Sequence, residues 1–83
     1  MTITKTDLKV LDAEVTCVIG SVESGVGYMY FGTNSGDVKK YNIQTGVITV
    51  LKNIGEKVAS MTLYSGTLWI GTASGKLISL TTS

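Results

Sequence analysis

Short apolar runs alternate with glycine-containing polar turns along the whole chain. The runs recur about every ten residues, a spacing typical of all-β folds. We expect no helix, because no window of eleven or so residues places apolar side chains three and four apart. The expected strands are residues 8–11, 15–19, 28–32, 37–42, 47–51, 58–64, 67–72 and 76–81.

The strand pattern is also an internal repeat. Residues 28–38 read YMYFGTNSGDV, and 39 positions later residues 67–77 read TLWIGTASGKL. The match extends to the N-terminal segment, because the apolar positions of residues 3–11 fall 40 positions before those of residues 43–51. A period of about 40 residues with a β-type pattern indicates the blades of a β-propeller.

The alignment of the two repeats predicts where each blade begins and ends. The whole chain, 1–83, is a single two-blade unit in which residues 15–51 make a complete four-stranded antiparallel blade. Residues 58–82 supply three strands of a second blade. Residues 3–11 have the pattern of a fourth, outer strand, and we expect this strand to be donated to the incomplete blade of a neighbouring subunit. The predicted interface residues are Ile3, Leu8, Val10, Leu77 and Leu80.

Closure of the ring requires several copies of the chain, because propellers contain about four to eight blades. We expect a homotrimer with six blades, with a tetramer of eight as the second choice. Apolar residues on both faces of residues 28–32 and 67–72 fit strands that are covered on both sides. The single cysteine, Cys17, excludes an intramolecular disulfide as the stabilising device.

Residues 30–38 and 68–77 resemble the blade core of quinoprotein-like and sensor-type β-propellers. In those blades an aromatic or aliphatic strand leads into Gly-Thr, a small polar turn ending in glycine, and another strand. Residues 41–46 (YNIQTG) resemble the turn between the third and fourth strands. The blades are WD-like only, because the Trp-Asp and Gly-His signatures of standard WD repeats are missing.

The plan of two blades per chain is also similar to that of small propeller lectins, whose chains close into six-bladed trimers. Their sugar sites are dense in tryptophan and arginine, whereas this chain has one tryptophan and no arginine. The resemblance therefore implies the assembly and not the sugar chemistry.

Composition argues against most kinds of chemistry. The chain has no histidine, no arginine and six acidic residues, so we expect no enzyme, no cofactor and no metal site. The loop at residues 71–76 has three residues between its glycines and lacks the helix context of a phosphate-binding loop. A net charge of +1 without arginine argues against nucleic-acid binding. Neither a membrane span nor a signal peptide is expected, and the default location is cytoplasmic.

Two aromatic residues, Tyr30 and Trp69, occupy equivalent positions in the repeat. We interpret both as packing residues between blades, with stacking on a ligand as the other role they allow. The predicted function is a non-enzymatic scaffold whose main partner is itself, with another protein or a carbohydrate as a further partner. The alternative is a ligand-binding propeller, lectin-like or specific for a small molecule, with repeated sites between blades. A third interpretation is that the chain is a piece of a longer propeller.

Overall fold

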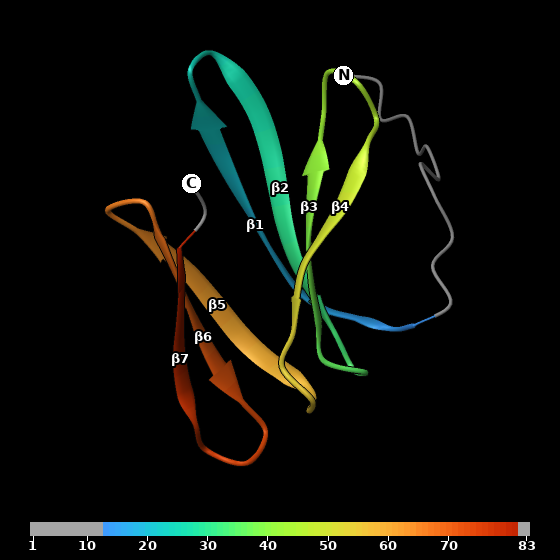
Figure 1. Cartoon of the computed structure of the whole chain (residues 1–83), viewed down its shortest axis with the longest axis vertical. Helices are drawn as coiled ribbons and strands as arrows, with labels where there is room; N and C mark the ends of the chain where they lie inside the picture. Colours follow the sequence, from blue (N-terminus) through green and yellow to red (C-terminus); the bar gives the residue numbers. More distant parts are fainter. Residues whose placement is uncertain (1–12, 82–83) are drawn as a thin grey trace, which may run out of the picture.

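The computed structural model describes residues 13–81, which form two antiparallel β-sheets (Figure 1). The strand order is β1-β2-β3-β4 in the first sheet and β5-β6-β7 in the second, so each sheet is a meander. The strands are β1 (Val15–Glu23), β2 (Val26–Thr33), β3 (Asp37–Asn42), β4 (Ile48–Asn53), β5 (Val58–Tyr64), β6 (Thr67–Thr72) and β7 (Leu77–Thr81). Residues 13–81 contain no helix, which confirms the all-β prediction. The expected strand at residues 8–11 lies outside the described residues.

The first hairpin is longer than the sequence pattern predicts. The pattern ends one strand at residue 19 and begins the next at residue 28, whereas β1 continues to Glu23 and β2 begins at Val26. The difference comes from glycines that look like turn residues but lie inside the strands. Gly20 pairs with Met29, and a Cβ on Gly27 would lie 3.2 Å from the side chain of Ile43.

The two hairpin tips share one conformation. Ser24 and Gly25 between β1 and β2 have φ angles of 52° and 78°, and Ser65 and Gly66 between β5 and β6 have 52° and 77°. Two successive positive φ values match the tight hairpin turn whose twist agrees with that of the flanking strands. The repeat in the sequence is therefore also a repeat in backbone geometry.

The turns after β2 and β6 repeat in the same way. The Thr33 hydroxyl accepts a hydrogen bond from Asp37 N, and the Thr72 hydroxyl accepts one from Lys76 N, both at 3.1 Å. The surroundings of the two turns differ at their glycines. A Cβ on Gly36 would lie 2.8 Å from the backbone N and O of Glu56, in the connection between the sheets, whereas a Cβ on Gly75 would meet no described residue within 4 Å.

The hydrophobic core lies between the two sheets. The contact runs through β5, which lies against β1 and β2. The first sheet contributes the fully buried side chains of Tyr30 and Val38. The second sheet contributes three more, Val58, Leu68 and Ile70.

The sheets stack by unlike faces. The first sheet turns inward its Tyr30 face, which carries Tyr30 and Gly32, and the second sheet turns inward its Leu68 face. In the repeat, Tyr30 corresponds to Trp69 and Leu68 corresponds to Met29. Because side chains alternate along a strand, Trp69 and Met29 lie on the two outer faces. The outer faces, named here the Trp69 face and the Met29 face, therefore repeat the two faces that meet inside.

Candidate functional site

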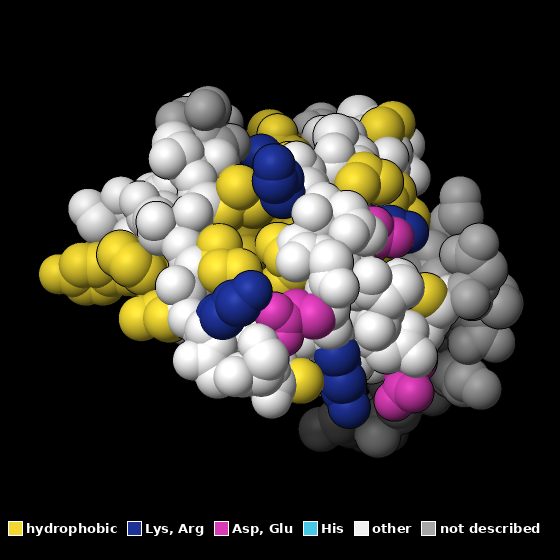
Figure 2. All heavy atoms as spheres, turned by 60° about the horizontal axis from the view of Figure 1, so that its bottom comes forward, with side chains coloured by type: hydrophobic (Ala, Val, Ile, Leu, Met, Phe, Trp, Pro, Cys, Tyr) yellow, Lys and Arg dark blue, Asp and Glu magenta, His cyan; other side chains and the backbone are white. Residues whose placement is uncertain are grey.

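The Trp69 face of the second sheet is open and carries three exposed large apolar side chains among serines and threonines. Trp69 is 38% exposed, and the register places Tyr64 and Leu77 on the same face, 73% and 74% exposed. Exposed apolar side chains gathered in one patch mark an interaction surface more often than scattered ones do. Figure 2 shows such apolar patches among lysine and acidic side chains on one side of the molecule.

The Met29 face of the first sheet is the second open surface. Val15, Val18 and Val50 lie on it and are 46%, 54% and 57% exposed. Val22, near the tip of the long hairpin, adds a side chain that is 77% exposed. Lys39 and the buried Phe31 lie on the same face, because the register pairs Lys39 with both Phe31 and Val50. The stack therefore has exposed apolar side chains at each end, and the two ends present different faces of the repeated unit.

The outer edge of the second sheet is formed by β7. Within residues 13–81, β7 pairs with β6 alone, while its equivalent in the first sheet, β3, pairs with both β2 and β4. Such an edge presents N–H and C=O groups that another strand can bind.

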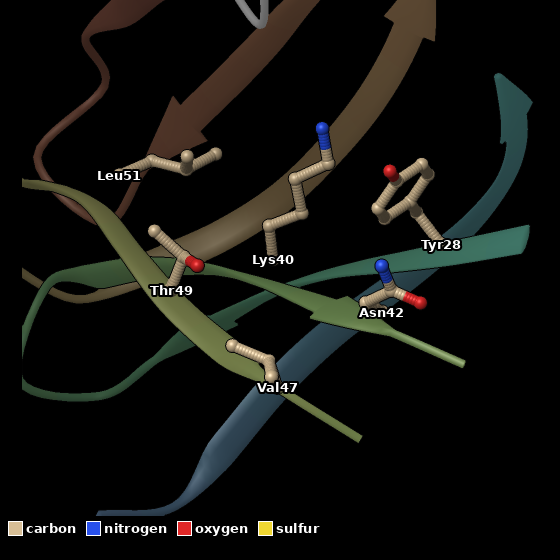
Figure 3. Close-up of a pocket in the computed structure, with 6 residues that line it drawn as sticks. All are labelled: Tyr28, Lys40, Asn42, Val47, Thr49 and Leu51. Atoms are coloured by element: carbon tan, nitrogen blue, oxygen red, sulfur yellow. The ribbon is translucent and has the colours of Figure 1, made fainter. Parts of the chain in front are cut away.

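The inward face of the first sheet has a cavity of about 330 Å³ beside β3 and β4. Its lining comes entirely from the first sheet and its β3–β4 connection, as Figure 3 shows, with the Lys40 side chain standing beside the Tyr28 ring. The lining residues are Tyr28, Lys40, Asn42, Val47, Thr49 and Leu51. This part of the inward face is not covered by the three strands of the second sheet.

A polar cluster borders this cavity. Lys40 Nζ lies 3.2 Å from Glu23 Oε1, and it sits 4.1 Å from the ring centroid of Tyr28 and 5.4 Å from that of Tyr30. The Tyr30 hydroxyl donates a hydrogen bond to Glu23 Oε2, and the Ser21 hydroxyl donates a second one at 3.3 Å. The lysine is thus held both by a carboxylate and by two aromatic rings, an arrangement that stabilises a cation at a partly desolvated position.

The cluster shifts the pKa of both charged groups. The Tyr30 hydroxyl lowers the pKa of the Glu23 carboxyl, burial raises it, and Lys40 lowers it further; the net pKa lies below the ordinary value. Burial lowers the pKa of the Lys40 ammonium, but the hydrogen bonds with Glu23 and Tyr30 outweigh this and raise it overall. Both groups are therefore charged at neutral pH, and their attraction stabilises the folded state.

The stability of the chain is expected to fall in acid through Glu23. A carboxyl whose pKa is lower in the folded state stabilises the fold above its unfolded pKa, and this contribution is lost as the pH falls through the folded pKa. The free energy of unfolding, measured by urea titration, should decrease as the pH falls from about 5 to about 3. Glu23→Gln should flatten this dependence, with Glu14→Gln as the control at an exposed position. An equally steep dependence in Glu23→Gln would contradict the assignment.

The second sheet does not repeat the cluster. Thr67, Trp69 and Ser79 stand where the first sheet has Tyr28, Tyr30 and Lys40, because the register pairs Trp69 with Ser79 as it pairs Tyr30 with Lys40. Glu23 belongs to the additional length of the first hairpin and has no equivalent.

Sequence reasoning missed Glu23 and Lys40 as partners. It placed residues 20–27 in a loop and gave them no position relative to Tyr30. A signal was present in the shared Ser-Gly pairs, Ser24-Gly25 and Ser65-Gly66. Aligning these pairs as hairpin tips would have extended the first hairpin and placed Glu23 at its end.

The structure separates the residues that the sequence singled out. Leu77 is exposed on the Trp69 face, whereas Leu80 is half-buried and packs against the core between the sheets. Ile3, Leu8 and Val10 lie outside the described residues. Tyr30 is fully buried in the core, and Trp69 is partly exposed on an outer face. The two aromatic residues therefore have equivalent positions and different surroundings.

The described part of the chain shows no group of three or more Cys, His, Asp or Glu side chains that could hold a metal ion. Cys17 is a free, half-buried thiol that packs beside the core. Among residues 13–81, no helix is long and apolar enough to span a membrane. Comparison of the chain with protein-family models, with curated proteins and with solved structures finds no match.

Proposed function

We propose that the chain is a non-enzymatic scaffold whose two sheets are blades of a closed homo-oligomeric β-propeller. Three copies with six blades are the favoured assembly, and four copies with eight blades come second. The ring would present its loops and hairpin tips on two rigid ends, where another protein can bind. The lack of histidine and arginine in the sequence supports a scaffold over an enzyme.

The observation that carries this proposal is the unlike stacking of the two sheets. The Tyr30 face of one sheet packs on the Leu68 face of the other, which is a head-to-tail contact. The outer Trp69 and Met29 faces are the repeat equivalents of these two faces, so a second copy can repeat the contact at either end. Head-to-tail contacts produce rings when the rotation per unit closes.

Strand exchange is the proposed means of closure. Residues 3–11 share their apolar pattern with residues 43–51, which include most of β4. In the first sheet, β4 pairs with β3. In the second sheet, β7 is the equivalent of β3, and within residues 13–81 no strand pairs with it in the way that β4 pairs with β3. A strand from another copy would pair with β7 and cover the cavity beside Lys40. Leu8 and Val10 of that strand would then add apolar contacts.

The assembly is tested by light scattering coupled to size-exclusion chromatography. The whole chain, with a protomer mass of 8.8 kDa, is expected to elute as one species of about three times that mass. Deletion of residues 2–11 should abolish this species. Adding a peptide of residues 1–12 to the shortened chain should restore the oligomer. A folded monomer of the whole chain would overturn the ring, and an intact oligomer after the deletion would overturn the strand exchange.

The alternative, a ligand-binding ring, is favoured by one observation. The cavity beside Lys40 combines an aromatic ring, an ammonium group, an amide and a hydroxyl, the donor types that bind a small polar molecule. A glycan and metabolite screen by thermal shift on the assembled protein separates the two functions. A ligand that raises Tm in the whole chain but not in Lys40→Met supports binding, whereas no shift in the screen supports the scaffold.

A further inference from the structure

The contact between the two sheets contains a side chain seated on a glycine. Val58, at the start of β5, is fully buried and lies over Gly32 of β2. A Cβ on Gly32 would be 2.5 Å from Val58 Cγ1 and 2.6 Å from Val58 Cβ, shorter than non-bonded contacts of real Cβ atoms. Only glycine at this position leaves room for the valine, so the pair sets how the second sheet is placed on the first.

The repeat contains a second glycine and a second valine of this kind, but within one chain these two residues are not in contact. Gly71 of β6 is the equivalent of Gly32, and Val15 at the start of β1 is the equivalent of Val58. The local geometry agrees, because Val15 pairs with Thr33 and Val58 pairs with Thr72, each just before a register irregularity.

Within residues 13–81 of one chain, Val15 does not pack on a glycine and Gly71 is not covered by a valine. Val15 is 46% exposed, and among residues 13–81 the space above Gly71 contains only Ser60 Oγ, 3.0 Å from an added Cβ. Val15 lies on the Met29 face and Gly71 lies on the Trp69 face, which are the opposite outer faces of the stack. The two residues therefore cannot meet in one copy, but they can meet between two copies.

We propose that Val15 of one copy seats on Gly71 of the next and repeats the contact of Val58 with Gly32. This inference rests on the proposed head-to-tail ring and names the contact that sets the placement of one copy on another. The occupant of the Trp69 face is thus the Met29 face of a second copy. Trp69, two residues from Gly71 on the same face, then packs beside Val15 and Val18, as Tyr30 packs in the core within the chain.

The chemistry of the two contacts differs in one respect that supports a second copy as the partner. The Tyr30 face carries the ion pair of Lys40 and Glu23, whereas the Trp69 face has Ser79 in the place of Lys40. Within residues 13–81, the register places no acidic or basic side chain on the Trp69 face beside β6. An uncharged surface with exposed Trp69, Tyr64 and Leu77 side chains fits the exposed valines of the Met29 face and does not repel the one lysine beside them, Lys39.

The test uses two variants, one that fills the space above Gly71 and one that replaces Val15 by a charged residue. Gly71→Ala and Val15→Asp are each expected to convert the oligomer to a species of 8.8 kDa, measured by light scattering, with the far-ultraviolet circular dichroism unchanged. The matched control is Gln44→Asp, which adds the same charge at an exposed turn and should leave the oligomer intact. Val15→Gly combined with Gly71→Ala removes the clash and should restore a measurable part of the oligomer.

The outcomes separate this inference from the proposed function. If the unmodified chain is itself a folded monomer, the ring fails and this contact fails with it. If the unmodified chain assembles and both single variants assemble equally well, the ring stands and the contact of Val15 with Gly71 is overturned. Because Val15 is partly exposed, Val15→Asp gives a clear answer even if Gly71→Ala disturbs folding.

Discussion

Replacing Gly32 by alanine is expected to lower the free energy of unfolding by about 3 kcal/mol. The new Cβ would meet three atoms of the Val58 side chain at 2.5 Å, 2.6 Å and 3.0 Å. Val58 has no exposed surface and no free direction in which to move. The clash is therefore relieved only by separating the two sheets, which exposes the core that holds them together.

The measurement is a urea titration, and the repeat supplies the matched control. Gly71→Ala makes the same change at the equivalent position, where the new Cβ meets Ser60 Oγ at 3.0 Å and no other atom of residues 13–81 within 4 Å. Both variants are best compared in a Val15→Asp background, so that association does not contribute to the measured stability. Gly71→Ala should then cost less than about 1 kcal/mol. Equal losses in the two variants would show that the clash with Val58 is not the cause.

Replacing Tyr30 by alanine is expected to cost about 4 kcal/mol. Its side chain is among the largest that are fully buried, and its ring lies in the core between the sheets. Alanine would leave a cavity there and would remove the hydroxyl that donates to Glu23. Tyr30→Phe keeps the ring and removes the hydroxyl with its hydrogen bond to the Glu23 carboxylate and its interaction with Lys40, for which we expect about 1.5 kcal/mol.

Unfolding curves of the two variants separate packing from hydrogen bonding at this position. Trp69→Ala is the control, because Trp69 has the equivalent position but is 38% exposed in a single chain. In the Val15→Asp background this control should lose clearly less stability than Tyr30→Ala, since less apolar surface is buried around it. If Tyr30→Phe proves as unstable as Tyr30→Ala, the hydrogen bond and not the ring is what matters at Tyr30.

Local sequence rules predicted the strands and turns well, because these depend on neighbouring residues. The bounds of β5 and β6 agree with the predicted runs at residues 58–64 and 67–72. The repeated Gly-Thr pairs, followed by Ser35-Gly36 and Ser74-Gly75, indicated turns. Thr33 and Thr72 explain why threonine is used in them, since their hydroxyls hold the turn closed.

The sheet contact and the polar cluster were not predictable in the same way. Gly32 reads as a strand residue before a turn, and nothing near it in the sequence shows that Val58 lies above it. Glu23 and Lys40 are 17 positions apart, and their contact depends on the additional length of the first hairpin. Contacts of this kind follow from how sheets stack, which the alternation of apolar residues leaves undetermined.

The contrast between Gly36 and Gly75 bears on how the two halves of a duplicated sequence can diverge. Both glycines have a φ above 90°, so in both turns other residues are strained. At Gly36 the backbone of Glu56 also excludes any side chain, whereas the space around Gly75 is open within the described structure. A side chain is therefore excluded at Gly36 both by the backbone conformation and by its neighbour, whereas at Gly75 the backbone conformation alone disfavours one. Two turns of nearly the same sequence and backbone geometry are thus constrained to different degrees, because within the described structure only the first is also packed against a neighbouring segment.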